Sequence, residues 1–246
     1  MTTVRSVYAA VCAEGRIRRD SAQEAAINAL DRVRQDVQKA QRRRWWSRSR
    51  RTATHPRGLY LHGPVGRGKT LLMDLFFGTF SSLPQPTRRR LHFHAFMQEV
   101  HARLHRARSA GGDVDSVARE IAQETRVLCL DEFQVTNVVD ALIMGRLFTN
   151  LFEAGLVLVC TANTAPEHLY EGGLQRDLFL PFIDTLGRYC NSVPVAGPED
   201  YRRRRMEGQR VYVCPEEAVT LDHLFALLTD GAEGGPLTLD NAGKTV

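Results

Sequence analysis

The sequence lacks long apolar segments. No run approaches the roughly 18 to 20 residues that a membrane-spanning helix requires, and the N-terminus has no apolar core of a secretory signal. An arginine-bearing start could resemble a transit peptide, but Glu14 and Asp20 interrupt it early. These absences lead us to expect an intracellular protein.

Cysteine is present without a pattern. The five cysteines are an odd number and widely scattered, with no C-x-x-C pair and no histidine at metal-ligand spacing: Cys12, Cys129, Cys160, Cys190 and Cys214. Such spacing argues against a disulfide framework and against a structural zinc site. Cys129 and Cys160 lie inside apolar runs, where cysteine usually acts as a small core residue.

Lysine is scarce. It occurs only at positions 39, 69 and 244, so arginine supplies nearly all of the 33 cationic side chains, which outnumber 28 acidic ones. Six of the ten residues from Arg42 to Arg51 are arginine, with Trp45 and Trp46 among them. This basic cluster is either a solvated loop or a surface for nucleic acid, anionic lipid or an acidic protein.

The chain is long enough for one α/β domain with appendages. Its 246 residues are 43% hydrophobic, which suffices for a core. Apolar spacing predicts a peripheral helix over residues 21 to 41, with Ser21 as its N-cap. We divide the chain into an N-terminal helix with a basic linker (1–52), a core (53–198) and an incomplete C-terminal segment (199–246).

From Gly58 onward, strand-like segments alternate with helix-like segments. Such alternation with apolar strands predicts a parallel sheet covered by helices on both faces. The expected strands span residues 58–62, 90–96, 127–130 and 156–160, and the expected helices span 69–80, 97–108, 114–124, 138–153 and 178–186. In the C-terminal segment we expect a strand at 210–214 and a helix at 221–228.

A complete G-x-x-x-x-G-K-T phosphate loop follows the first expected strand. It consists of Gly63, Pro64, Val65, Gly66, Arg67, Gly68, Lys69 and Thr70, and Leu71 continues the predicted nucleotide-binding segment. The glycines let the backbone adopt positive φ and bring successive N–H groups around an anion. Lys69 can reach the β- and γ-phosphates, and the Thr70 hydroxyl can bind Mg²⁺. The segment therefore predicts a nucleoside triphosphate site.

A second motif has the form of a Walker B strand. Four apolar residues, 127–130, end in Asp131 and Glu132, at the edge where open α/β sheets bind ligands. We expect Asp131 to hold Mg²⁺, directly or through water, and Glu132 to orient or polarise the water that attacks the γ-phosphate. We also expect this strand to lie next to the strand that precedes the phosphate loop.

Two further polar residues complete the predicted site. The strand 156–160 is followed by Thr161-Ala162-Asn163, and Asn163 suits the task of a sensor 1 residue that bonds the attacking water or a γ-phosphate oxygen. Its alternative role is a helix N-cap, which Thr164 could supply instead. Arg176 is the preferred arginine finger, acting in trans on a neighbouring subunit's nucleotide. Arg188 is the other candidate finger, and an ordinary surface ion pair is the alternative for both.

These motifs, in this order, resemble an AAA+ ATPase and, more narrowly, the ZapE/Afg-type ATPase family. The likeness covers about residues 15 to 205. It is carried by segments 58–76, 90–97, 130–136, 166–170, 173–176, 179–183 and 200–202. The pair His92 and His94 before Phe96-Met97 is part of it. Two apart on one strand face, these histidines are expected to be packed and hydrogen-bonded rather than to ligate a metal.

The resemblance implies a three-layer P-loop NTPase fold of the AAA+ type with a central parallel five-stranded sheet. It implies ATP and Mg²⁺ as cofactors, and hydrolysis that uses Lys69, Glu132, Asn163 and Arg176. Two departures from the family pattern are visible in this chain. Asn137 stands where the family usually has aspartate, and the helical lid with its sensor 2 arginine is expected to be missing or truncated.

The resemblance also implies partners and a location. Bacterial members are cytoplasmic ATPases that associate with the division ring and the tubulin-like protein FtsZ, whereas mitochondrial relatives look like quality-control factors at the inner membrane. The bacterial role fits better because no convincing presequence is visible. A nucleotide-dependent homo-oligomer and a peripheral contact with the inner membrane at the division site are further expectations.

Two other interpretations stay open. The chain could be an ATP-gated binding module with little hydrolysis, which loss of the lid would favour. It could also be a DNA-associated AAA+ loader, which the basic cluster from Arg42 to Arg51 suggests, although nucleic acid is the less favoured partner.

Overall fold

The computed structural model describes residues 2–17, 19–46, 55–80, 87–109 and 111–195, together with 240–241 and 244–245. Contacts divide the chain into two units, Met1–Glu199 and Asp200–Val246. In the second unit the described residues form strands β6 (Asp240–Asn241) and β7 (Lys244–Thr245), which pair antiparallel. The strand expected at 210–214 and the helix expected at 221–228 lie outside the described residues.

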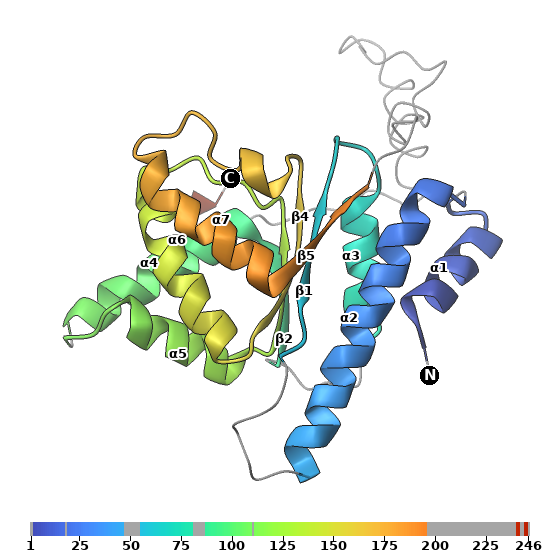
Figure 1. Cartoon of the computed structure of the whole chain (residues 1–246), viewed down its shortest axis with the longest axis horizontal. Coiled ribbons are helices and arrows are strands. Elements are labelled where there is room, and N and C mark those ends of the chain that lie inside the picture. Colours follow the sequence, from blue (N-terminus) through green and yellow to red (C-terminus); the bar gives the residue numbers. More distant parts are fainter. Residues whose placement is uncertain are drawn as a thin grey trace. The chain divides into compact units, whose positions relative to one another are not determined.

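The first unit is built on a five-stranded parallel sheet (Figure 1). Its strands are β1 (Gly58–His62), β2 (Arg88–His92), β3 (Val127–Asp131), β4 (Val157–Ala162) and β5 (Cys190–Pro194), in the spatial order β2-β3-β4-β1-β5. Strand β4 thus lies between β1 and β3 and pairs with both. The expectation that the strand with the acids lies next to the strand before the phosphate loop is therefore wrong.

Helices cover both faces of the sheet (Figure 1). One face carries α1 (Val4–Ala13), α2 (Ser21–Trp46) and α3 (Lys69–Gly78), and the other carries α4 (Phe93–Ser109), α5 (Val114–Glu124), α6 (Val138–Glu153) and α7 (Arg176–Tyr189). A short 3₁₀ helix, η1 (Pro166–His168), precedes α7. None of the described helices is both long and apolar enough to span a bilayer.

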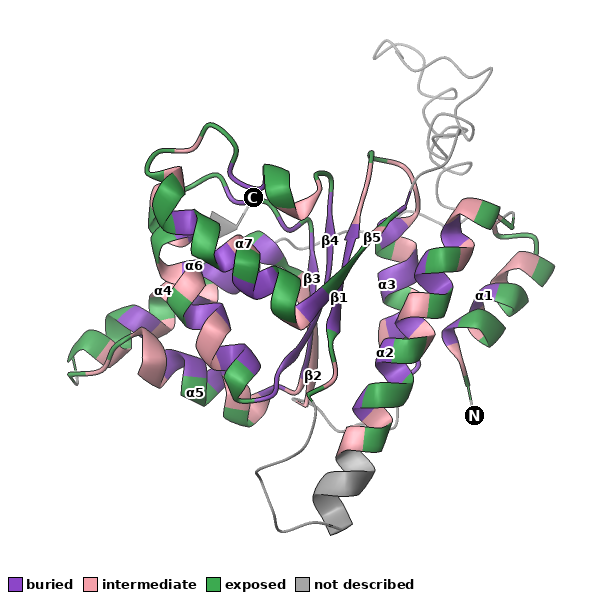
Figure 2. Ribbon diagram, in the orientation of Figure 1, coloured by how far each residue is buried: buried purple, intermediate pink, exposed green. Residues whose placement is uncertain are grey.

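The central strands are apolar on both sides because each face packs against its own helices. In β1, Leu59 and Leu61 belong to a cluster with the α1–α3 layer, whereas Tyr60 belongs to the cluster of the α4–α7 layer. Every residue of β3 and β4 is buried (Figure 2). Such burial on both faces is typical of parallel sheets and explains why these strands read as continuous apolar runs in the sequence.

The predicted bounds of α5 and α6 are confirmed, and local capping explains them. The Asp113 side chain accepts from the Ser116 amide and closes a capping box, so α5 begins at Val114. The Asn137 side chain accepts from the Val139 amide at 2.8 Å, so α6 begins at Val138. Asn137, the departure from the family pattern, thus acts as a helix N-cap.

The predicted strand at 90–96 is wrong in its second half. Strand β2 ends at His92, and α4 begins at Phe93. Phe93, Phe96, Met97 and Val100 are buried at helical spacing, which outweighs the strand-like alternation before them. His94 consequently lies on a helix, so His92 and His94 do not share a strand face.

Three features of this unit were not expected. Helix α1 and the edge strand β5 have no counterpart among the predicted elements; β5 is short and mostly exposed, so it carries little apolar signal. Asp20, rather than Ser21, caps α2, because its carboxylate accepts from the Ala22 amide at 2.8 Å. The basic cluster from Arg42 to Arg51 lies where the structure describes no side chains.

Candidate nucleotide site

The predicted phosphate loop connects β1 to α3 at the carboxyl edge of the sheet. Gly63, Gly66 and Gly68 have φ values of 147°, 80° and 77°, so the predicted positive φ values are confirmed. Gly68 is the N-cap of α3 and supplies no side chain to the first amides of that helix. The free amides of a helix N-terminus attract anions, so this end of α3 is suited to phosphate.

Space also requires glycine at Gly63, where the neighbouring atom is backbone, whereas the neighbour of Gly68 is the end of the flexible Gln23 side chain. A β-carbon on Gly63 would lie 2.4 Å from the Val195 carbonyl oxygen, and one on Gly68 would lie 2.7 Å from the Gln23 amide nitrogen. Gln23, on α2, donates from that nitrogen to the Arg67 carbonyl oxygen at 3.0 Å. The loop is therefore held between the end of β5 and helix α2.

Lys69 is folded back into the loop that it follows. Its ammonium donates to the carbonyl oxygens of Gly63 at 2.7 Å and Pro64 at 2.8 Å, and to Asn163 Oδ1 at 3.2 Å. The side chain is almost completely buried. A flexible ammonium in this position can turn from carbonyl oxygens to phosphate oxygens without leaving the site.

Asp131 is a buried carboxylate with several donors. Its Oδ1 accepts from the Thr70 hydroxyl at 3.1 Å, from the Glu132 amide at 3.2 Å and from the Thr161 hydroxyl. Its Oδ2 lies 3.3 Å from Arg90 Nη2 on β2. The helix after the phosphate loop thus brings Thr70 to Asp131 even though β4 separates β1 from β3.

The oxygen pair Thr70 Oγ1 and Asp131 Oδ1 fits a magnesium ion. Mg²⁺ prefers hard oxygen ligands and keeps several waters, so one hydroxyl and one carboxylate near a phosphate suffice. The two atoms already lie 3.1 Å apart at the end of the phosphate loop. The donor set therefore agrees with the metal predicted from the sequence.

Glu132 differs from Asp131 in exposure. Its side chain is 73% exposed, and its Oε2 lies 4.0 Å from His92 Nδ1. Its backbone has φ 54°, a left-handed conformation that is uncommon outside glycine. Glu132 is thus a carboxylate that lies next to the buried Asp131 and is open to water.

Asn163 and Lys69 are brought together, but the two arginines are not part of this cluster. Arg176 is the first residue of α7 and donates to the Glu167 carbonyl at 2.6 Å. Arg188 lies near the other end of α7 and donates to Thr185 Oγ1 at 3.0 Å. Within the described part of the chain, neither arginine shows a hydrogen bond to the phosphate loop or the acids.

Three residues in the site were not predicted to act there: Thr161, Arg90 and Gln23. Thr161 was noted only as part of the segment that contains Asn163. Its place at the carboxyl end of an apolar strand was a usable signal, because open α/β sheets bind ligands at that edge. Arg90 and Gln23 carried no such signal, since their contacts depend on strand order and helix packing.

The site includes one titratable group with a shifted pKa. Burial lowers the pKa of His62, the last residue of β1, and the nearby Lys69 ammonium lowers it further, against an opposing effect of Glu167. The lowered pKa favours the neutral form of the imidazole at the point where β1 leads into the phosphate loop.

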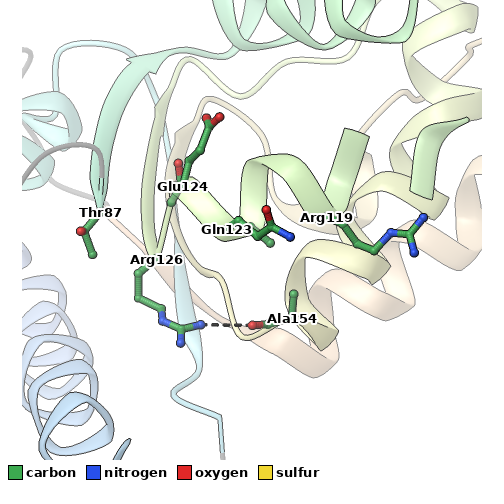
Figure 3. A pocket seen from close by; sticks show the side chains of 8 residues that line it. Thr87, Arg119, Gln123, Glu124, Arg126 and Ala154 are labelled. Atoms are coloured by element: carbon green, nitrogen blue, oxygen red, sulfur yellow. Dashed lines mark hydrogen bonds between the residues drawn. The ribbon is translucent and has the colours of Figure 1, made fainter. Parts of the chain in front are cut away.

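A cavity of about 430 Å³ lies elsewhere, near the amino ends of β2 and β3 (Figure 3). Thr87, Gln123, Arg126 and Ala154 are among its lining residues. Arg126 donates to the Ala154 and Gly155 carbonyl oxygens at 3.1 and 3.0 Å. This cavity is at the sheet edge opposite the phosphate loop and is separate from the nucleotide site.

Fold and site together define a P-loop ATPase of the AAA+ class. The class rests on the parallel order β2-β3-β4-β1-β5, the glycine loop between β1 and α3, and the acids that end β3. The model of the AFG1-like ATPase family matches residues 2–242. The chain belongs to the AFG1-like ATPase family.

Individual relatives agree with this assignment. The chain is 36% identical to the cell division protein ZapE of Escherichia coli K12, in an alignment that covers 97% of this chain and 67% of that protein. It is 41% identical to lactation elevated protein 1 homolog B of Danio rerio over 65% of this chain and 34% of that protein. The chain therefore spans only about a third of the zebrafish relative.

Solved structures confirm the fold. AMPPCP-bound DnaA from Aquifex aeolicus superposes with a TM-score of 0.53 and 11% identity, covering 92% of this chain and 64% of that chain. DnaI superposes with a TM-score of 0.50 and 18% identity, covering 76% of this chain and 87% of that chain. At such low identity the likeness concerns the fold alone.

Proposed function

We propose that this ATPase hydrolyses Mg²⁺-bound ATP at the carboxyl edge of the sheet, between the phosphate loop and the acids of β3. The observation that carries the proposal is the meeting of Thr70 with Asp131 at 3.1 Å and of Lys69 with Asn163 at 3.2 Å. These contacts join the loop after β1 to the ends of β3 and β4. A phosphate chain laid along the loop would face all four side chains.

In this proposal the loop amides and the N-terminus of α3 bind the phosphates, and Lys69 turns from its carbonyl partners to the β- and γ-phosphates. Magnesium, held by Thr70 and Asp131, would neutralise charge on the phosphate oxygens. Glu132 takes the proton of the attacking water as general base. Asn163 holds that water or a γ-phosphate oxygen in line for attack.

The basic test is release of phosphate from ATP by the purified chain, with Mg²⁺ and with the ion removed by a chelator. We expect turnover that depends on the metal, and calorimetric binding of Mg²⁺-ATP. Binding without measurable turnover would instead support the alternative, a module that ATP only switches between affinities. Absence of both would contradict the proposal.

We also propose that the chain forms a nucleotide-dependent homo-oligomer in which an arginine completes the neighbour's site. Arg176 remains the preferred residue and Arg188 the alternative. The two lie at opposite ends of α7, so a neighbouring chain would meet them at different places. Mixing each arginine variant, Arg176→Ala or Arg188→Ala, with a Lys69→Ala chain should distinguish them. If Arg176 is the finger, Arg176→Ala should be inactive alone and regain turnover in the mixture, because the Lys69→Ala neighbour supplies the missing arginine to its intact phosphate loop. If Arg188 is the finger, Arg188→Ala should show this recovery instead.

The partner and location are proposed from the bacterial relative. The similarity to a protein named for cell division supports a cytoplasmic role at the division site, with the tubulin-like FtsZ as the protein on which the ATPase acts and a peripheral contact with the inner membrane. Co-sedimentation with FtsZ polymers, with and without ATP, tests this. No change in the sedimented fraction would remove FtsZ as the partner while leaving the ATPase proposal intact.

A further inference from the structure

The end of strand β4 contacts both halves of the nucleotide site. Strand β4 lies between β1 and β3 and pairs with each. The Ala162 carbonyl oxygen accepts from the Gly63 amide at 3.2 Å, and Asn163 accepts from Lys69. These two residues serve the phosphate loop, whereas Thr161 serves the acids on the other side. Strand β4 separates the strand of the phosphate loop from the strand of the acids, and the residues at its end bond to both motifs.

The Thr161 hydroxyl is used both as donor and as acceptor. It donates to Asp131 Oδ1 and accepts from the Glu132 amide at 3.2 Å. Thr161 is 2% exposed, so water does not readily replace either bond. The Thr161 carbonyl also accepts from the Phe133 amide at 2.7 Å. One residue of β4 thus bonds three successive residues of the neighbouring strand end.

These bonds act where the backbone is strained. Glu132 has φ 54°, and a residue with a β-carbon adopts that conformation only when its surroundings impose it. The Glu132 side chain is largely exposed and lies 4.0 Å from the nearest basic group, His92. Its direction is therefore set mainly through its backbone, whose amide is held by Thr161 and Asp131.

We propose that Thr161 is a positioning residue for the acid pair: its hydroxyl fixes the Asp131 carboxylate and holds Glu132 in the conformation that aims its side chain at the attacking water. This inference rests on the proposed role of Glu132 as general base. Thr161 itself touches neither substrate nor metal and acts through the two acids.

The test compares Thr161→Val, which keeps the shape of the side chain but removes the hydroxyl, with Thr161→Ser, which keeps the hydroxyl. Displacement of a catalytic group by a fraction of an ångström to one ångström is expected to lower kcat by about 10- to 100-fold. We expect that loss for Thr161→Val, with a smaller change in the KM for ATP, because Lys69 and the loop amides are untouched and only the Asp131 carboxylate of the metal site is loosened. Thr161→Ser should recover most of the turnover.

A matched control is available in Thr79, which is 8% exposed and donates to the Phe76 carbonyl at 2.7 Å at the C-terminal end of α3. Thr79→Val removes a buried hydroxyl from the α1–α3 layer without touching the acids or either candidate arginine finger. It should lower thermal stability but leave kcat near the wild-type value. Equal kcat losses in Thr79→Val and Thr161→Val would overturn the inference.

A second measurement needs no nucleotide. Hydrogen exchange of the Glu132 amide reports the bond to Thr161 directly, and we expect exchange at least about tenfold faster in Thr161→Val than in wild type or Thr161→Ser. Unchanged exchange would overturn the inference. If Thr161→Val does not fold, Thr161→Ser decides: low turnover or fast exchange in that variant contradicts a role of the hydroxyl. A wild type without turnover would contradict the proposed function, and the exchange rates would still test Thr161.

Discussion

The two edges of the parallel sheet use their charged side chains differently. At the amino edge, Arg126 donates to the last carbonyls after α6, and Arg57 donates to the Gly187 and Cys190 carbonyls at 2.6 and 3.1 Å at the end of α7. At the carboxyl edge, the N-terminus of α3 receives no capping side chain. Fixed cations thus close helix C-termini at one edge, whereas the other edge leaves a helix N-terminus for a ligand.

This comparison separates structural charge from functional charge. The amino-edge arginines bond carbonyls that no ligand needs, so their loss should reduce stability. At the carboxyl edge, Lys69 donates to the carbonyls of Gly63 and Pro64, which belong to the phosphate loop itself. Its loss should therefore reduce function. Variants at the two edges should therefore change different measurements.

Loss of Lys69 should have the largest effect. Lys69→Ala removes the cation that we propose to bind the β- and γ-phosphates, and we expect kcat/KM for ATP to fall by about 10³-fold. Steady-state phosphate release measures this change. Lys39→Ala is the control, because Lys39 lies on the exposed surface of α2, where it pairs with Asp36 at 3.4 Å. A similar decrease in both variants would break the comparison of the edges.

Loss of the Glu132 carboxylate should be next in size. Glu132→Gln keeps the shape but removes the base, and we expect kcat to fall by about 100-fold while calorimetry still detects ATP binding. Glu153→Gln, at the end of α6, is the control with an exposed carboxylate at the opposite edge. Negligible, equal turnover in wild type and Glu132→Gln would indicate that the chain binds ATP without hydrolysing it.

Loss of an amino-edge arginine should affect stability alone. Arg126→Met leaves the Ala154 and Gly155 carbonyls without their donor, and we expect the free energy of unfolding to fall by about 1–2 kcal/mol. Chemical denaturation measures the loss, and kcat should stay within about twofold of wild type. A large decrease in kcat with little change in stability would mean that the cavity of Figure 3 takes part in function.

The smallest expected effect is a pH dependence from His62. Its pKa is lowered in the folded chain, chiefly by burial, so protonation favours the unfolded state. The neutral imidazole therefore leaves the free energy of unfolding unchanged above the unfolded pKa of about 6.5. As pH falls below that value, protonation of the unfolded state lowers the free energy of unfolding. Wild type should therefore lose more stability than His62→Asn between pH 7.5 and pH 5.5, as measured by urea denaturation. Parallel losses would contradict the assignment.

Local signals were enough to predict much of this chain. The glycine spacing of residues 63–68 predicted the positive φ values that the loop adopts, and the helix-like segments 114–124 and 138–153 predicted the bounds of α5 and α6. These features depend on neighbours within a few residues. The family, the AAA+ class and the parallel sheet between two helical layers were likewise predicted correctly.

Features that depend on distant neighbours were missed. Nothing local in Val157–Ala162 indicates that β4 enters between β1 and β3, and the bonds of Thr161 and Arg90 to Asp131 follow from that order. At His92 and Phe93, strand and helix patterns overlap, and packing of the α4 face decides between them. The roles of Glu132, Asn163 and Arg176 in catalysis stay predictions.

Helix α2 has a practical consequence for anyone shortening this chain. Its side chains Ile27, Leu30 and Val33 share one buried cluster with β1 and α3, and Gln23 fastens the Arg67 carbonyl. Removing the first fifty residues to obtain a minimal fragment would expose that cluster to solvent. It would also remove the hydrogen bond that Gln23 donates to the phosphate loop. Expression fragments should therefore begin ahead of Val4.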